Sequence, residues 1–471
     1  MRRLSPRAAA YIVAAIVAAS FFYDLLRMPV QVSDSLIEIL DVQRSPSIYD
    51  TFVANAQGAA YLRPLRLAVI KGLFDVADGH YWLAYRGFHA LLLVAAILLF
   101  VRALRVQTWI DCGAAVFALT VLTGMHTFRG TVREAYPVNH FLEIVVLCLV
   151  TLNLAQSRGG RWVDAAAVVS LVAASLILES GLLVWVVAGA AFYSGMRGIS
   201  RNGFIAMSSL VGLYFWARFA YLDMGTPGLV ERSSGYLLAM LEPIELQRRF
   251  SDNPLWFYQY NIGTSVLSVL FSEPQGGIFE LVRTWLRGDV PPRLYVAVIS
   301  STLATGLIAV MFAGRLRRRE AFALTDDDRL LIVFAAVLIA NGAMSYAYTK
   351  DEIISVAGAF YALAAYAAAR YVATRVPRLQ SRAGRGAVCL MLAVMATLWA
   401  FRSAGVHHML RVQAFKERKD WATPAARYLK EDTAEDRRAA ALVRQLRRDA
   451  FEMHVPNPGL LPRWQDRWWG E

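Results

Sequence analysis

Residues 82–104 read WLAYRGFHALLLVAAILLFVRAL, an almost unbroken apolar run with an arginine near each end. About 20 apolar residues in an α-helix match the thickness of the hydrocarbon core of a bilayer. No water reaches the backbone there, so a spanning segment must satisfy its own hydrogen bonds, as a helix does. A β-barrel would show short segments of alternating polarity instead. The run therefore predicts a membrane-spanning helix.

Similar runs recur along the chain and predict about eleven membrane-spanning helices. The run at residues 1–26 has no small-residue cleavage site at its end, so we interpret it as a helix and not as a signal peptide. Residues 163–194 are too long for one crossing and carry Glu179, Ser180 and Gly181 at their centre, which favours a hairpin of two helices. The predicted spans are residues 1–26, 82–104, 108–128, 140–156, 163–178, 181–194, 203–222, 294–314, 329–348, 352–371 and 386–404.

The composition also indicates a protein surrounded by lipid. Hydrophobic residues make up 57% of the 471 residues, charged residues only 18%, and the mean hydropathy is +0.41. Ordinary soluble domains are less apolar. The three cysteines, Cys112, Cys148 and Cys389, fall inside apolar runs, which excludes a disulfide framework and a zinc spacing. We assign the net charge of +13 to basic cytoplasmic loops and expect no nucleic-acid partner.

The positions of the basic residues predict the orientation, because Lys and Arg favour the cytoplasmic side of short loops. The basic segments are residues 2–7, 102–105, 158–161, 197–201, 315–319 and 370–385. The amino terminus then lies in the cytoplasm and the carboxyl terminus outside. Two large outer loops follow, residues 27–81 and 223–293, with apolar interfacial helices at residues 62–74 and 256–271. A transmembrane domain of residues 1–404 would precede a short polar, extracytoplasmic tail, residues 405–471.

Several ionisable residues fall at or just beyond the outer ends of the predicted helices. Asp34 and Glu38 would share one face of a helix, so that one can act as general base while the other orients substrate or binds a metal. Glu179 lies at the centre of an apolar segment, where an acid is costly and indicates a functional site. Arg133 and Lys350 are suitable donors to a phosphate. The other candidates at this level are Arg63, His89, Glu134 and His140.

Two observations limit these assignments. His89 lies on an apolar helix, where a single histidine is assigned equally to packing or to the site. The chain has no Gly-rich phosphate loop, which argues against a soluble nucleotide as substrate.

The order of short motifs along the chain is similar to that of a known family. The motifs are Asp34, then Tyr61-Leu62-Arg63-Pro64-Leu65, Phe88-His89-Ala90-Leu91, Glu134-Ala135-Tyr136-Pro137 with Glu143, Glu179-Ser180 and Asp252-Asn253-Pro254. In order and placement they resemble the GT-C superfamily of polyprenyl-phosphate-sugar glycosyltransferases, and within it the transmembrane O-mannosyltransferases that often carry tetratricopeptide repeats. The chain departs from that family at Ser35, where a second acid is common, at Leu178, where the family has lysine, and in the short Lys350-Asp351-Glu352 segment.

The resemblance implies an all-α GT-C-like fold and a transfer of sugar from a polyprenyl-phosphate carrier to an acceptor hydroxyl on the extracytoplasmic side, with inversion. Asp34 would be the general base, with Glu38 as its nearest substitute. Developing charge on the leaving phosphate would be met by Arg63, Arg133 and Lys350. The remaining residues of the expected substrate site are His89, Glu134, His140 and Glu179.

The expected partners are the lipid-linked donor, a glycan, lipid or protein acceptor, and the lipid of a bacterial inner (plasma) membrane. No cofactor is certain, and the use of a divalent metal stays open. Two other functions also stay open. A transporter or flippase for a lipid-linked glycan needs a similar cavity, although transporters favour polar sites near the midplane. A GT-C-like scaffold without catalysis is the other, because Ser35 replaces the second acid.

Overall fold

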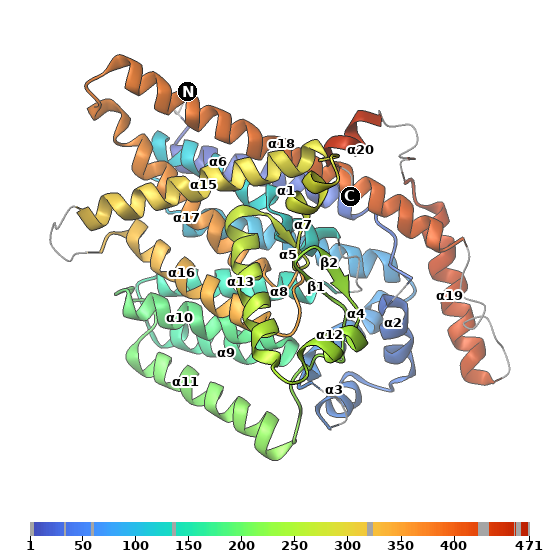
Figure 1. Ribbon diagram of the computed structural model, residues 1–471. Helices are drawn as coiled ribbons and strands as arrows, with labels where there is room; N and C mark the ends of the chain where they lie inside the picture. Colours follow the sequence, from blue (N-terminus) through green and yellow to red (C-terminus); the bar gives the residue numbers. More distant parts are fainter. Residues whose placement is uncertain are drawn as a thin grey trace.

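Long α-helices lie side by side across the molecule, and shorter helices gather at one end (Figure 1). The computed structural model describes residues 4–32, 34–57, 61–133, 138–317, 324–422, 433–455, 457 and 463–469. Within these residues the strands form only two small antiparallel hairpins, which pair β1 with β2 and β3 with β4. The described chain is therefore almost entirely helical, as predicted.

The elements described between Pro6 and Tyr221 are all helices or helical turns. They are α1 (Pro6–Leu25), α2 (Asp34–Arg44), α3 (Ile48–Gln57), α4 (Pro64–Ala77), α5 (Tyr81–Ala103), α6 (Trp109–Gly124), α7 (His126–Arg133), α8 (His140–Ala155), α9 (Arg161–Ile177), the 3₁₀ turn η1 (Glu179–Leu182), α10 (Leu183–Tyr193), α11 (Arg201–Phe215) and the π-helical turn η2 (Trp216–Tyr221).

The second half contains the two hairpins and the longest helices. Its elements are β1 (Ser234–Tyr236), β2 (Ala239–Leu241), α12 (Pro243–Phe250), α13 (Pro254–Phe271), β3 (Pro274–Gln275), β4 (Ile278–Phe279), α14 (Glu280–Leu286), α15 (Pro292–Arg317), α16 (Asp326–Met344), α17 (Ser355–Ala373), the 3₁₀ turn η3 (Val376–Arg378), α18 (Arg382–Asp420), α19 (Ala434–Glu452) and α20 (Arg463–Trp469).

Six of the described helices are long and apolar enough to cross a membrane, judged by length and composition. They are α1, α5, α11 with η2, α15, α17 with η3, and α18. The pair α6 and α7, bent by 59°, would be a seventh span, and two shorter apolar helices are α8 and η1 with α10. These helices are consistent with an integral membrane protein. The predicted number of eleven is reached only if α8, α9, α10 and α16 cross as well.

The predicted break at Glu179 is present in the structure. Helix α9 ends at Ile177, Leu178 is extended, and η1 turns the chain into α10. Gly181 makes this turn tight, because a Cβ atom added there would lie 2.1 Å from backbone atoms of Ala174. The hairpin thus depends on a residue without a side chain.

Helix α18 is longer than predicted. The predicted span ended at Ala404, but the helix continues without a break to Asp420. The added turns bury several side chains, so contacts with the rest of the protein stabilise them where the apolar pattern has ended. The buried residues beyond the predicted end are Gly405, Val406, His408, Met409, Leu410, Ala414 and Glu417.

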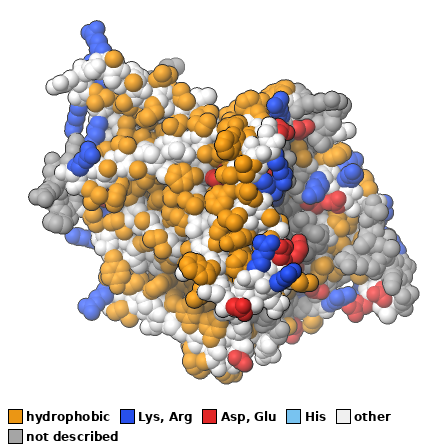
Figure 2. Space-filling model, viewed as in Figure 1, with side chains coloured by type: hydrophobic (Ala, Val, Ile, Leu, Met, Phe, Trp, Pro, Cys, Tyr) orange, Lys and Arg blue, Asp and Glu red, His pale blue; other side chains and the backbone are white. Residues whose placement is uncertain are grey.

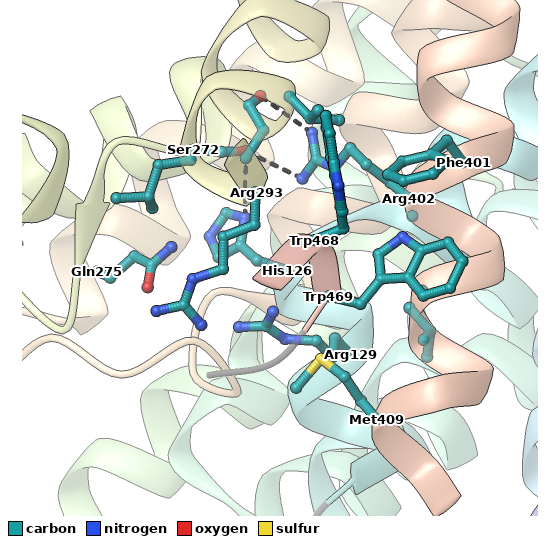
Figure 3. A pocket seen from close by; sticks show the side chains of 16 residues that line it. His126, Arg129, Ser272, Gln275, Arg293, Phe401, Arg402, Met409, Trp468 and Trp469 are labelled. Carbon is teal, nitrogen blue, oxygen red and sulfur yellow. Dashed lines mark hydrogen bonds between the residues drawn. The ribbon is translucent and has the colours of Figure 1, made fainter. Parts of the chain in front are cut away.

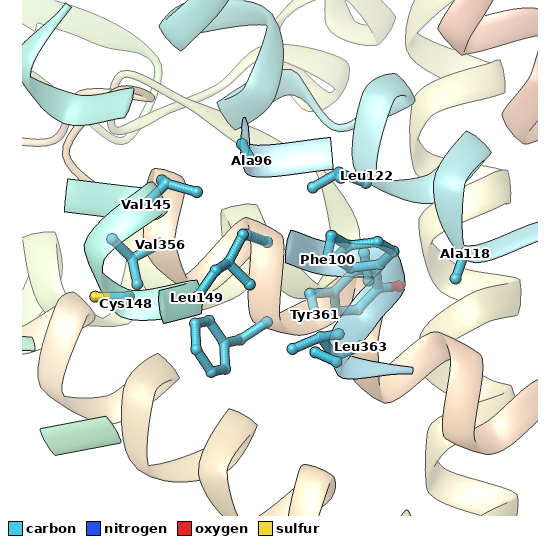
Figure 4. Packing of buried hydrophobic residues seen from close by; sticks show 14 of the residues in the cluster. Ala96, Phe100, Ala118, Leu122, Val145, Cys148, Leu149, Val356, Tyr361 and Leu363 are labelled. Atoms are coloured by element: carbon cyan, nitrogen blue, oxygen red, sulfur yellow. The ribbon is translucent and has the colours of Figure 1, made fainter. Parts of the chain in front are cut away.

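The core of the bundle forms where α5, α6, α8 and α17 meet. Phe100, Leu122, Leu149 and Tyr361 come from these four helices and pack in one cluster (Figure 4). Helix α17 is central, since every residue from 355 to 369 is buried. Many of these residues are alanines, which allow neighbouring helices to approach closely.

The basic loops meet at one end of the bundle, on the left in Figure 1. Arg370 lies 3.0 Å from Asp111 and 3.1 Å from Asp327, which joins α17 to α6 and α16. Arg329 Nε donates to the Ser194 carbonyl at 3.2 Å. Figure 2 shows Lys and Arg side chains at this edge and hydrophobic side chains over the middle of the molecule. The gathering of basic loops at one end agrees with the alternation that the sequence predicts.

Candidate functional site

A cavity of about 450 Å³ lies at the end of the bundle that faces away from the basic loops. Its walls come from the start of α4 and α8, the turn η1, the end of α11 with η2, and the connection between α16 and α17. Cations dominate its polar lining, and Glu179 is the one carboxylate among the lining residues that the structure describes. The cations are Arg63, Arg66, Arg218, Arg232 and Lys350. Such a lining favours an anionic ligand.

Glu179 is held between two arginines. Arg63 Nε donates to Glu179 Oε2 at 2.9 Å and to Oε1 at 3.2 Å. Arg218 Nη1 lies 3.3 Å from Oε1 and also donates to the Tyr214 hydroxyl at 3.2 Å. One carboxylate is thus shared by two guanidinium groups, which would otherwise repel each other. Glu179 therefore positions the two arginines.

Aromatic rings orient two of the cations further. The Arg63 guanidinium lies 4.3 Å from the centre of the Tyr61 ring, and that of Arg232 lies 5.0 Å from the Tyr348 ring. The Tyr61 hydroxyl donates to Glu231 at 2.6 Å. Burial and this hydrogen bond raise the pKa of Tyr61 to about 12, so the phenol is neutral at physiological pH. Arg63 thus lies between a fixed carboxylate and a neutral aromatic ring.

His140 contributes an imidazole to the cavity wall. Its Nδ1 lies 2.7 Å from Glu143 Oε2, and its buried Nε2 has no hydrogen-bond partner among the residues that the structure describes. An ionised carboxylate only accepts hydrogen bonds, so Nδ1 carries the hydrogen in this pair. In the neutral ring, Nε2 is then left as an acceptor. His140 therefore contributes to the cavity wall a ring whose buried Nε2 has no partner among the described residues.

The two acids of the first outer loop lie on α2, which packs against α4. Asp34 is the first residue of α2, and its side chain lies outside the described part of the structure. Glu38 pairs with Arg66, a lining residue of the cavity. Asp34 precedes Glu38 by about one turn of α2.

Two further predicted residues, His89 and Arg133, are described by the structure and do not line this cavity. His89 is fully buried in α5, where its ring nitrogens contact Arg86 and a backbone carbonyl, as expected for a packing residue. Arg133 lies at the end of α7; burial raises the pKa of the nearby Asp351, and Arg129 and Arg133 oppose that rise. Glu134 lies outside the described residues. The structure thus brings Arg63, His140, Glu179 and Lys350 together and leaves His89 and Arg133 apart.

Three cations of the cavity were not among the sequence candidates. Arg218 falls inside the predicted span 203–222, and a charged residue in an apolar span indicates a functional site. The sequence therefore held a signal by which Arg218 could have been identified as a site residue. Arg66 and Arg232 lie in polar segments, where no local pattern separates them from other surface arginines.

Within the described ranges, no group of three or more His, Cys, Asp or Glu side chains could hold a metal ion. No family model, curated protein or solved structure matches this chain.

Proposed function

We propose that the chain is a membrane glycosyltransferase that moves a sugar from a polyprenyl-phosphate carrier to an acceptor hydroxyl on the extracytoplasmic side. The observation that carries this proposal is the cavity lined by five cations and by apolar side chains that include Leu182, Phe215 and Met344. A lipid phosphate needs both surfaces, because the cations bind the phosphate and the apolar wall accepts the first part of the hydrocarbon chain.

The arrangement of the cations suits a leaving phosphate. Negative charge grows on the phosphate oxygens as the glycosidic bond breaks, and preorganised donors stabilise that charge without having to move. Glu179 already holds Arg63 and Arg218, while Lys350 can approach as a point charge. Attack on the anomeric carbon from the face opposite the phosphate inverts its configuration.

The proposed general base remains Asp34, with Glu38 as its nearest substitute. A general base that takes the proton from the acceptor hydroxyl contributes roughly a hundred- to ten-thousandfold to the rate. His140 also lines the cavity, so its imidazole is the alternative acceptor to be tested by substitution. The acceptor hydroxyl belongs to a glycan, a lipid or a protein.

The proposal includes a GT-C-like topology with eleven crossings in a bacterial inner membrane. It counts α8, α9, α10 and α16 as spans, with the amino terminus in the cytoplasm and the carboxyl terminus outside. The basic loops and the cavity lie at opposite ends of the bundle, which supports this orientation. If the basic loops face the cytoplasm, the cavity faces the outer side.

Incubation of the purified protein with polyprenyl-phosphate sugars of several kinds tests the proposal. We expect release or transfer of sugar from at least one donor, with a lower kcat/KM for the donor in the double variant Arg63→Gln and Lys350→Gln. Arg287→Gln, which changes an exposed arginine outside the cavity, is the matched control. A protein that releases no sugar but moves a lipid-linked glycan across vesicles would be a flippase. A protein that binds the lipid and does neither would be the inactive scaffold.

A further inference from the structure

A second pocket, of about 190 Å³, lies between α7, α15, α18 and α20 and shares no lining residue with the first cavity. Arg129, Arg293 and Arg402 line it together with Gln275, and no acidic residue is present in the part of its lining that the structure describes. Figure 3 shows the guanidinium groups of Arg129 and Arg293 directed into the same space, near the amide of Gln275. Two like charges that share one space favour an anion between them.

Within the described part of the chain, the hydrogen-bond partners of Arg402 are all uncharged. Its Nη1 donates to Ser300 Oγ at 2.8 Å and to Ser301 Oγ at 2.9 Å, and its Nη2 donates to Ser272 Oγ at 3.3 Å. The guanidinium also lies 4.1 Å from the Trp399 ring. Hydroxyls and an aromatic ring hold the group in place but do not neutralise it. The side chain is therefore fixed in position with its charge still available to a ligand.

The carboxylates near the other two arginines are shared with further cations. Asp351 and Glu352 attract Arg129, and Glu280 attracts Arg293. Asp351 also interacts with Arg133 and Lys350, and Glu280 pairs with Arg283. Among the described residues named here, the cations therefore outnumber the carboxylates that they share.

Helix α20 closes the pocket with two tryptophans. Trp469 packs against Gly405, where an added Cβ atom would lie 2.4 Å from the Trp469 ring. The bond between His408 Nε2 and Asp466 Oδ1, at 3.1 Å, holds α20 on α18. The buried Nε1–H of Trp469 finds no acceptor within the described part of the chain. Trp469 is therefore a donor on this wall that has no partner among the described residues.

We propose that this pocket is a second anion site, which binds a phosphate group supplied by a membrane-lipid headgroup or by inorganic phosphate. Guanidinium groups bind phosphate oxygens through paired, charge-assisted hydrogen bonds. Phe401, Val406 and Met409 give the pocket an apolar side, and tryptophans are favoured at the membrane interface. The site is independent of the glycosyl transfer proposed above, since it uses none of the residues of the first cavity.

The test uses the full-length protein with Arg63→Gln as background, so that the first cavity contributes less to binding. Inorganic phosphate is titrated by its protection against thermal unfolding. Retention of phosphatidic acid is compared by native mass spectrometry with that of diacylglycerol, which lacks the phosphate. We expect protection, retention or both, and about tenfold weaker binding for each of Arg129→Gln and Arg293→Gln. Arg287→Gln should change nothing.

Asp351→Asn is a further variant, which distinguishes an effect on the site from a loss of binding through misfolding. Removal of the competing carboxylate should tighten phosphate binding by about fivefold, and a gain of affinity does not arise from a misfolded protein. Preference for phosphatidic acid over diacylglycerol would assign a lipid source, and binding of inorganic phosphate alone would assign a soluble one. Equal retention of both lipids without protection by phosphate would overturn the proposal. Binding that is unchanged in Arg129→Gln, Arg293→Gln and Asp351→Asn would also overturn it.

Discussion

Glu179 has a role that its neighbours determine. Its position in an apolar segment predicts that it matters, but the sequence does not reveal that Arg63 and Arg218 both bind it. The two arginines come from distant segments, so their convergence is a product of the fold. The reason for an acid at this place is therefore electrostatic, because one carboxylate keeps two cations together.

Glu179→Gln keeps the size of the side chain and removes the charge that Arg63 and Arg218 share. We expect the free energy of unfolding to fall by about 1–3 kcal/mol, at the lower end of the range because Glu179 is partly exposed to water. Thermal unfolding in one detergent measures the change. Glu245→Gln, which breaks an exposed pair with Arg249, is the control and should cost less than about 1 kcal/mol. Equal losses in the two variants would show that Glu179 is an ordinary surface acid.

Asp34→Asn is expected to abolish sugar transfer in a protein that still folds. The amide keeps the size and hydrogen-bonding capacity of the side chain but does not take up the hydroxyl proton. Transfer assays and thermal unfolding, run on the same preparation, separate the two effects. Should Glu38→Gln inactivate the enzyme while Asp34→Asn does not, the base lies one helical turn further along α2. Should only His140→Gln inactivate it, the imidazole is the base.

At the scale of elements, local pattern located most helices well. The predicted span 82–104 is α5 (Tyr81–Ala103), and the predicted interfacial helix 256–271 is α13 (Pro254–Phe271). Apolar periodicity and helix-breaking residues are local signals, which explains this agreement. The second half of α18 was missed because its sequence is polar and its stability comes from packing against other parts of the chain. The same limit applies to the cavity, where Arg63, His140, Glu179 and Lys350 were predicted from the sequence. Arg66, Arg218 and Arg232 were not among the candidates.

Gly181→Ala tests the hairpin of α9 and α10. The new methyl group would overlap the backbone of Ala174, which cannot move as a flexible side chain does. We expect the free energy of unfolding to fall by about 1–3 kcal/mol or more. Gly212→Ala in α11 is the matched control, since its Cβ would meet no atom within 4 Å and alanine favours a helix by about 0.5–1 kcal/mol. A Gly181→Ala protein as stable as the unmodified chain would mean that the turn is looser than described.

In the molecule as a whole, the basic loops lie at one end of the bundle and the cavity lies at the other end. The predicted topology places these ends on opposite sides of the membrane. Ser35, close to the predicted base, is fully buried and unsuited to chemical labelling. Ala54 in α3 and Ser381 before α18 are exposed and lie on the two predicted sides.

Single cysteines at these two positions test the orientation, in a chain whose exposed Cys389 is replaced by serine. A membrane-impermeant thiol reagent added to whole cells should label Ala54→Cys and leave Ser381→Cys unlabelled until the membrane is opened. The physical reason is that positive loops resist translocation. Labelling of Ser381→Cys alone would invert the topology, and with it the side on which the cavity opens.

The proposed function requires that the cavity around Glu179 binds a lipid-linked phosphate. A cryo-electron microscopy structure of the protein in lipid nanodiscs with an added polyprenyl phosphate would reveal where the phosphate binds. We expect phosphate density within hydrogen-bonding distance of Arg63, Arg218 or Lys350, with the hydrocarbon chain leaving along the apolar wall. An empty cavity in a protein whose polyprenyl phosphate is bound elsewhere, in the pocket of Arg129, Arg293 and Arg402 or on another surface, would rule out this binding site.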